Sequence, residues 1–186
     1  KKVIDQFWNL KLIKEPSNIF RLDYNKIRNL EGWGELSINN LKASIQKSKK
    51  ITLDKLIFSI GIRHIGQENA KILASFFGSI KSFKKIFKTS ERAEIFKSLI
   101  ELDGIGDTQI ESLNNFFSNK TNIRISSELI KELEISEYKT KNIDGKFSNL
   151  SLMFTGGFTN MSRSEAKSIA ENNGGKVLGS VSKKLD

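Results

Sequence analysis

The sequence of 186 residues contains no cysteine, a single proline and a single histidine. Without cysteine, these residues hold neither a disulfide bond nor a cysteine zinc site. No apolar run approaches the roughly 20 residues that a membrane-spanning helix needs. An acid also interrupts the N-terminal stretch, where a signal peptide would be apolar. These absences argue against a disulfide-stabilised secreted domain and predict a soluble, intracellular protein.

Basic residues are in excess, because 31 lysines and arginines face 21 acids and give a net charge of +10. The excess is uneven along the chain. Residues 47–89 carry ten basic residues against two acids, whereas residues 90–140 carry six against ten. Such a concentration favours an anionic partner. The alternative is a lysine-rich composition that only keeps the protein in solution.

One pattern occurs three times and can be registered on Gly34, Gly66 and Gly106. The residues four, seven and eleven positions after each of these glycines are apolar, and so is the residue just before it. That spacing puts the apolar side chains on one face of a helix. A recurring unit indicates a repeated structural element. We predict three helix–turn–helix copies and a fourth copy cut in half at the N-terminus, with Ile4 and Phe7 at its first two apolar positions.

The glycines of these turns leave backbone N–H groups uncovered where the second helix of each copy begins, and such amides suit a phosphate. The predicted DNA-binding residues are Gly32, Gly34, Gly61, Gly66, Gly104, Gly106, Arg63, His64, Lys55 and Lys71. The central turn is the stronger candidate, because acids flank the third. The alternative is structural, since helix corners often require a positive φ and use glycine for it. A positive φ at Gly66 would make Gly66→Val costly to folding and binding.

The remaining helical segments follow from apolar periodicity and capping residues. Helices are expected at residues 3–10, 19–22, 24–30, 35–46, 53–60, 67–77, 79–89, 90–100, 107–117 and 126–133. Residues 79–89 alternate apolar residues with lysines, which predicts a connecting helix with one buried and one basic face. Trp33 is expected to pack between helices rather than enter a DNA groove, because isoleucines take its place in the other copies.

The pattern changes after residue 142. Residues 151–155 and 176–178 predict two strands, and Ser162 with Glu165 forms a capping box that opens a helix between them. We therefore expect a mainly α fold followed by an α/β segment. The predicted division is a DNA-binding domain at residues 1–135, a linker at 136–142 and the α/β segment at 143–186.

Two sets of residues resemble a known family. Leu-Glu-Gly-Trp-Gly at residues 30–34 and Ile-Phe-Ser-Ile-Gly-Ile-Arg-His-Ile-Gly at residues 57–66 resemble the tandem helix-hairpin-helix domain of bacterial NAD-dependent DNA ligases. Phe-Thr-Gly at 154–156, Met-Ser-Arg at 161–163 and Gly-Gly-Lys-Val at 174–177 are similar to the first half of a BRCT domain, which closes the chain in that family. The resemblance covers essentially all of the sequence. It implies a tandem helix-hairpin-helix domain followed by a truncated BRCT-like segment.

The resemblance also implies a function. It is non-sequence-specific binding to the backbone phosphates of nicked double-stranded DNA, as the clamp of an enzyme that seals nicks in replication and repair. The expected partners are this DNA and the other domains of the same ligase chain, with no membrane. The expected location is the bacterial cytoplasm, in association with the nucleoid.

The resemblance implies NAD, Mg²⁺ and Zn²⁺ for the parent enzyme and no cofactor within these residues. DNA ligases attack the cofactor with a lysine in a Lys-x-Asp-Gly motif, and the nearest stretch, residues 141–145, has one residue too many. Neither a catalytic nor a metal-binding residue is therefore predicted here. These residues alone are expected to be inactive.

Two alternatives stay open. The chain is then either the helix-hairpin-helix module of another repair or recombination protein, such as a nuclease or a branch-migration subunit, or a protein-interaction adaptor. The first class usually carries two hairpins, and the basic residues 47–89 argue against the second. A four-cysteine cluster and a Lys-x-Asp-Gly motif upstream of residue 1 would decide for the ligase.

Overall fold

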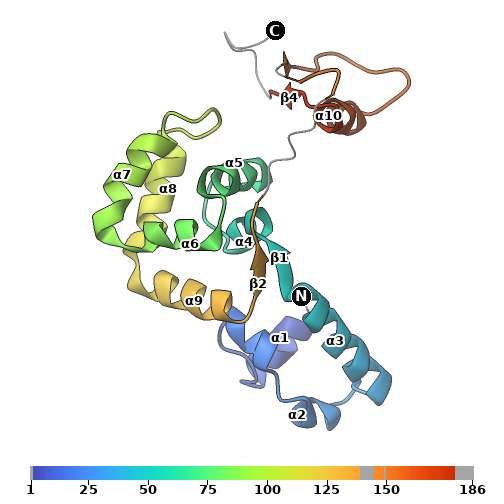
Figure 1. The fold of residues 1–186 in the computed structure, drawn as a ribbon. Coiled ribbons are helices and arrows are strands. Elements are labelled where there is room, and N and C mark those ends of the chain that lie inside the picture. Colours follow the sequence, from blue (N-terminus) through green and yellow to red (C-terminus); the bar gives the residue numbers. More distant parts are fainter. Residues whose placement is uncertain (1, 139–144, 149, 179–186) are drawn as a thin grey trace. The chain divides into compact units, whose positions relative to one another are not determined.

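The computed structural model describes residues 2–138, 145–148 and 150–178. The chain divides into two compact units, Lys1–Lys139 and Thr140–Asp186. The first is mainly helical and the second combines one helix with two short strands (Figure 1). The predicted fold class, mainly α followed by an α/β segment, is confirmed. Most of the linker predicted at residues 136–142 lies outside the described residues.

The first unit starts with α1 (Lys2–Asn9), the 3₁₀ turn η1 (Pro16–Arg21), α2 (Tyr24–Arg28), α3 (Glu35–Ser48) and β1 (Lys50–Thr52). It continues with α4 (Leu53–Ser59), α5 (Gln67–Phe77), α6 (Ile80–Phe83) and the 3₁₀ turn η2 (Lys84–Phe87). It ends with α7 (Thr89–Leu99), α8 (Asp107–Ser118), α9 (Lys120–Lys131) and β2 (Glu134–Ser136).

Several predicted boundaries need correction. The last helix begins at Lys120 rather than Ser126, because the side chain of Asn119 accepts hydrogen bonds from the amides of the first turn and caps the helix there. The helix expected at residues 19–22 is instead a 3₁₀ turn that begins at Pro16, whose fixed φ suits a first helical position. The segment 79–89 is two short pieces, α6 and η2, rather than one helix.

Strands β1 and β2 were not predicted. They pair in parallel, with Lys50 opposite Glu134, and join the start of the second hairpin motif to the end of α9. Each strand has three residues and a single apolar side chain in the middle, Ile51 or Ile135. Strands this short carry too little alternation to be recognised from the sequence. The sequence around β1 therefore predicts the end of a helix, and the sequence around β2 predicts a linker.

The first unit has two hydrophobic cores. The smaller one comes from the N-terminal helices and the first hairpin motif, with Phe7, Ile13, Leu22, Ile27, Ile38 and Ile45 buried in it. The larger one is shared by the second and third motifs and the connecting segment, with Leu53, Leu73, Phe83, Leu99, Leu113 and Phe117 fully buried. The second and third hairpins therefore stand on one common core, and the first stands on another.

Ion pairs connect η1 and its N-cap residue, Glu15, to α9. The guanidinium of Arg21 donates to Glu132 at 2.6 Å, and that of Arg124 donates to Glu15 at 2.8 Å. The hydrogen bond from Arg124 is the main reason why the pKa of Glu15 lies below its ordinary value. Lys131 has the same effect on the pKa of Glu128, which also pairs with Arg21. The basic side chains are exposed and the glutamates are half-buried, and solvent screening at the exposed partners keeps the contribution of each pair to stability small.

The second unit contains β3 (Ser151–Leu152), α10 (Arg163–Asn172) and β4 (Lys176–Val177). The two strands pair in parallel, which gives the predicted strand–helix–strand unit. The capping box is confirmed: the Ser162 hydroxyl accepts from the Glu165 amide at 3.2 Å, and the Ser162 amide donates to the Glu165 carboxylate at 2.7 Å. The backbone hydrogen bond from Ser162 lowers the pKa of Glu165. Ala166 and Ala170 form the buried face of α10.

Candidate nucleic-acid interface

The same backbone geometry closes all three hairpins. In each, the amide of the residue before the registered glycine donates to the carbonyl three residues earlier. These bonds run from Trp33 to Leu30, from Ile65 to Ile62 and from Ile105 to Leu102, each at 3.1 Å. The carbonyl of each registered glycine then accepts a hydrogen bond from the amide four positions later. These amides belong to Ile38, Ala70 and Ile110. The register predicted from Gly34, Gly66 and Gly106 is therefore the structural register.

The residue two positions before each registered glycine has a positive φ. It is Gly32 in the first hairpin (φ 81°), His64 in the second (φ 60°) and Gly104 in the third (φ 88°). Histidine is one of the few residues other than glycine that adopt this conformation repeatedly. His64 thus occupies a glycine position of the repeat, a role that the sequence analysis missed although its register already placed the residue there.

Gly66 does not have a positive φ, so the prediction that Gly66→Val would strain the turn is wrong. Its φ is −80° and its ψ is −175°, which is extended backbone, and a Cβ built there meets nothing within 4 Å. In the central hairpin the glycine with a positive φ is Gly61, at 75°, just after the end of α4. The sequence could not tell which of the two glycines makes the sharp turn.

Gly34, Gly66 and Gly106 are the N-caps of α3, α5 and α8. Glycine has no side chain to accept a hydrogen bond, and no cap side chain covers the first-turn amides of these helices. In the third hairpin the Gln109 side chain instead accepts from the amide of Gly106 at 3.0 Å. That bond satisfies the amide of the N-cap residue itself, so the first turns of α3, α5 and α8 alike keep amides that no side chain caps and that can bind an anion.

The charges around the hairpins differ. Arg63 and His64 lie exposed at the tip of the central hairpin. Glu31 and Glu35 flank the first hairpin, with Arg28 4.0 Å from Glu35. Asp103 and Asp107 flank the third. The central hairpin has one acid beside it, Glu68 in the first turn of α5, which pairs with Lys71. Since carboxylates repel phosphate, the central hairpin still offers the most favourable field of the three.

The two predicted lysines lie at different places relative to the central turn. Lys71 is on α5, partly buried, with its ammonium 3.1 Å from the Glu68 carboxylate. Lys55 is exposed in the first turn of α4, six positions before Gly61 and hence about 9 Å along the helix axis from it. It lines an open groove beside β1 and β2 together with Lys50 and Glu134. Lys71 is therefore on the helix whose N-terminus faces the turn, and Lys55 is at the opposite end of α4.

The third hairpin packs against the helix of the second. A Cβ built on Gly104 would lie 2.8 Å from the Cδ1 atom of Ile72, on α5. Gly104 therefore combines a positive φ with a close approach to a neighbouring motif. Its place in the structure is explained by packing, while its role toward DNA stays a prediction.

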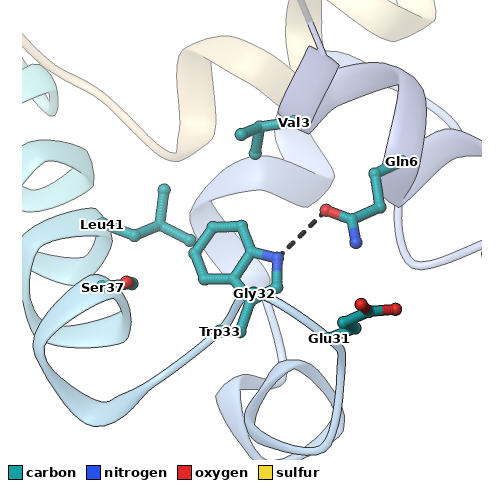
Figure 2. A pocket seen from close by; sticks show the side chains of 7 residues that line it. All are labelled: Val3, Gln6, Glu31, Gly32, Trp33, Ser37 and Leu41. Carbon is teal, nitrogen blue, oxygen red and sulfur yellow. Dashed lines mark hydrogen bonds between the residues drawn. The ribbon is translucent and has the colours of Figure 1, made fainter.

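Trp33 packs inward, as expected. Its indole N–H donates to the Gln6 side chain at 3.0 Å, and its ring centroid lies 5.2 Å from that of Phe7 on α1. Figure 2 shows the indole between Gln6 and Leu41, at an open cavity of about 400 Å³. The ring is held by α1 as well as by its own motif, which ties the first hairpin to the N-terminal helix.

Potential metal-ligating side chains do not gather in the part of the chain that the structure describes. Within residues 2–138, 145–148 and 150–178, histidine, aspartate and glutamate side chains form no group of three that could hold a metal ion. Residues 141–144 of the Lys-x-Asp-Gly-like stretch lie outside the described part. No helix in the described ranges is long and apolar enough to cross a bilayer.

Comparison with known proteins gives two family matches. The helix-hairpin-helix motif family matches residues 55–125, which run from α4 into α9 and include the second and third hairpins. The BRCA1 C Terminus (BRCT) domain family matches residues 142–186, which include the strand–helix–strand unit.

Curated relatives match along the whole chain. A DNA ligase of Pelagibacter ubique is 49% identical over 186 residues, which are 100% of this chain and 27% of that protein. DNA ligases of Afipia carboxidovorans and Rickettsia bellii are 36% and 39% identical, over 100% and 94% of this chain and 28% and 27% of their own lengths. The chain thus spans about a quarter of the length of the relatives that it matches.

Proposed function

By similarity over its whole length the chain belongs with the part of bacterial DNA ligases that joins helix-hairpin-helix motifs to a BRCT domain, and from this premise we propose that it grips the backbone of duplex DNA. The contacts are to phosphates and not to base edges. Such binding is independent of sequence, as an enzyme that acts at any nick requires. Within the parent enzyme, this segment is the clamp that holds nicked DNA beside the catalytic domains of the same chain.

The central hairpin carries the proposal. Gly66 leaves the first-turn amides of α5 without a cap, and Arg63 and His64 stand exposed at the same turn. A phosphate there meets backbone donors, the positive end of a helix and a guanidinium together. Gly61, Gly66, Arg63, His64 and Lys71 form this contact, and Lys55 adds charge from the far end of α4. The hairpins at Gly32 and Gly34 and at Gly104 and Gly106 make weaker contacts.

The remaining parts of the proposal concern the parent enzyme. We assign NAD, Mg²⁺ and Zn²⁺ to its other domains, as the resemblance to NAD-dependent DNA ligases implies. DNA ligases accept AMP on the lysine of a Lys-x-Asp-Gly motif, which this sequence lacks, so we expect the chain alone neither to accept AMP from NAD nor to seal a nick. We place the parent enzyme in the bacterial cytoplasm, where its substrate lies on the nucleoid.

Binding of the full 186-residue chain to a labelled duplex tests the proposal. Fluorescence anisotropy should show similar affinity for unrelated sequences, and log K should fall with log salt by about 0.9 per neutralised phosphate. Arg63→Ala should weaken binding and lower this slope by up to about one unit without changing the melting temperature. Lys146→Ala, which removes an exposed cation in the second unit, is the matched control and should leave both unchanged.

A strong preference for one sequence would contradict backbone recognition. If Arg63→Ala leaves affinity and slope at the wild-type values, the central hairpin is only a helix corner. A covalent AMP adduct on the purified chain would overturn the assignment of the chemistry to other domains.

A further inference from the structure

The connecting segment α6–η2 carries three lysines and no acid, and a fourth lysine, Lys88, follows it directly. Lys81, Lys84, Lys85 and Lys88 are all exposed, while Phe83 and Ile86 between them are fully buried in the larger core. Lys88 is paired with Glu91 at 2.9 Å, whereas the other three lysines make no ion pair with a described residue. The segment is thus fixed by its apolar side and presents a row of unneutralised charge on the other.

This row lies away from the hairpin tips. Helix α7 has 11 residues and runs from the end of η2 to the third hairpin, so about 16 Å of helix separates the two. Helix α5, also of 11 residues, separates the central hairpin from the start of α6 in the same way. In Figure 1 the turn between α7 and α8 lies at the upper end of α7, and α6 lies near its lower end. The lysines therefore belong to a surface of their own.

A buried arginine adjoins the same surface. Arg92 is only 6% exposed, and its guanidinium donates to the Ile86 carbonyl at 3.1 Å, the Ser118 hydroxyl at 3.0 Å and the Thr89 hydroxyl at 3.3 Å. All three acceptors are neutral, and no described carboxylate lies within ion-pair distance. A buried charge normally has an ionic partner. Thr89 and Ser118 are themselves exposed, so the hydroxyls that accept from the guanidinium reach solvent, and the Ser118 hydroxyl also donates to the Asn114 side chain at 3.5 Å.

We propose that Lys81, Lys84 and Lys85, with Thr89 and Ser118 held by Arg92, form a second phosphate-binding surface that holds a second segment of duplex DNA. This inference rests on the proposed function, since the hairpins hold the first duplex. Arginine, lysine and hydroxyl side chains are the groups that contact DNA phosphates. A line of cations also suits a duplex, which carries a regular row of negative charges. The chain then bridges two DNA segments that contact opposite ends of the same helices.

A bridging assay with the full chain tests this. One duplex is immobilised, a second carries a fluorophore, and capture of the second by the first is measured at limiting protein and rising salt. The wild type should capture the second duplex at low salt. The triple variant Lys81→Gln, Lys84→Gln, Lys85→Gln should reduce capture at least tenfold and change the affinity for a single short duplex less than twofold.

Two controls make the outcome specific. The variant Lys2→Gln, Lys14→Gln, Lys47→Gln removes three exposed cations elsewhere and should retain capture. Arg63→Ala should weaken the binding of a single duplex, whereas the triple variant should leave that binding nearly unchanged. Arg92 is buried, so its replacement risks unfolding the third motif. Ser118→Ala removes only one of the three acceptors of this guanidinium, so it should lower the melting temperature and capture while the chain stays folded, and unchanged capture would count against the hydroxyl's part in the surface.

Single-duplex binding without capture in the wild type would overturn the second surface and leave the proposed function standing. Absence of any duplex binding would overturn the proposed function itself. Capture that survives the triple variant would also refute the inference, because it places bridging at the hairpins or in a dimer. Displacement of the second duplex by poly-glutamate as readily as by unlabelled duplex would assign the surface to an acidic protein and refute the nucleic-acid reading.

Discussion

Gly66→Ser should separate the stability of the central hairpin from its function, because the two should change in opposite directions. The backbone at Gly66 is in the extended conformation that N-cap residues adopt, and a Cβ there has open space around it. The new hydroxyl can accept from the amide of Glu68 or Asn69, two or three positions on. A cap of this kind satisfies a donor that, in the proposed function, contacts a DNA phosphate.

The magnitudes follow from the two parts of the change. Serine exceeds glycine as an N-cap by a few tenths of a kcal/mol, and loss of glycine's freedom in the unfolded chain adds about 0.4–1 kcal/mol. A gain of about 1 kcal/mol should raise the melting temperature by about 2–5 °C. A phosphate that must compete for the amide loses a hydrogen bond worth about 0.5–1.5 kcal/mol, so DNA binding should weaken about 2- to 10-fold. The salt slope should stay constant, because no cation is removed.

Thermal unfolding and anisotropy on the same preparations measure both effects. Gly34→Ser is the matched control, since Gly34 has the same extended backbone (φ −87°) and the same open space. It should raise the melting temperature equally and weaken binding less, because acids flank the first hairpin. Stabilisation by Gly66→Ser with unchanged affinity would refute the phosphate role of these amides. A fall in stability would refute the account of the cap.

Further changes test other parts of the chain. Because His64 and Gly104 both have a positive φ, His64→Gly should raise the free energy of unfolding by up to about 1 kcal/mol, and Gly104→Ala should lower it by about 1–2 kcal/mol. Urea unfolding measures both changes, and changes of the same sign would refute this account. The pKa of Glu15 is lowered in the folded state, so its ion pair with Arg124 stabilises above the ordinary pKa of 4.5 and is lost as pH falls through the folded value. Hydrogen exchange in η1 and α9 should therefore rise below that pH, and Glu15→Gln should remove this part of the dependence. Amides of residues 150–178 should exchange faster than those of residues 53–77, because β3 and β4 have two residues each and pair only with one another among the described strands; equal protection would contradict this.

The hairpins could be predicted because their signal is local. Apolar spacing after Gly34, Gly66 and Gly106 reports one helix face, and the structure buries those side chains wholly or in part. The conformation of each glycine could not be read in the same way, since Gly61 and Gly66 look alike in sequence and differ by the sign of φ. The register of the repeat does predict one of these conformations. It aligns His64 with Gly32 and Gly104, and all three residues have a positive φ.

The features that escaped prediction depend on contacts between distant residues. Lys50 and Glu134 pair across 84 positions, and three residues on each side give no local pattern. Arg92 lies on an amphipathic helix where a charged side chain is expected to face solvent, yet Ile86 and Ser118 draw its guanidinium inward. Only the assembled core brings such partners together. The DNA-binding residues stay a prediction for the same reason, since their partner is another molecule.

The parallel pairing of β1 with β2 has a mechanical consequence. The chain enters the second and third motifs through β1 and leaves them through β2, and the two strands run in the same direction. Tension between the preceding and following segments therefore acts along the strands in opposite senses. It loads their hydrogen bonds together, in shear, instead of opening them one after another. A pull on the residues before β1 and after β2 is therefore resisted by all the hydrogen bonds of this strand pair at once.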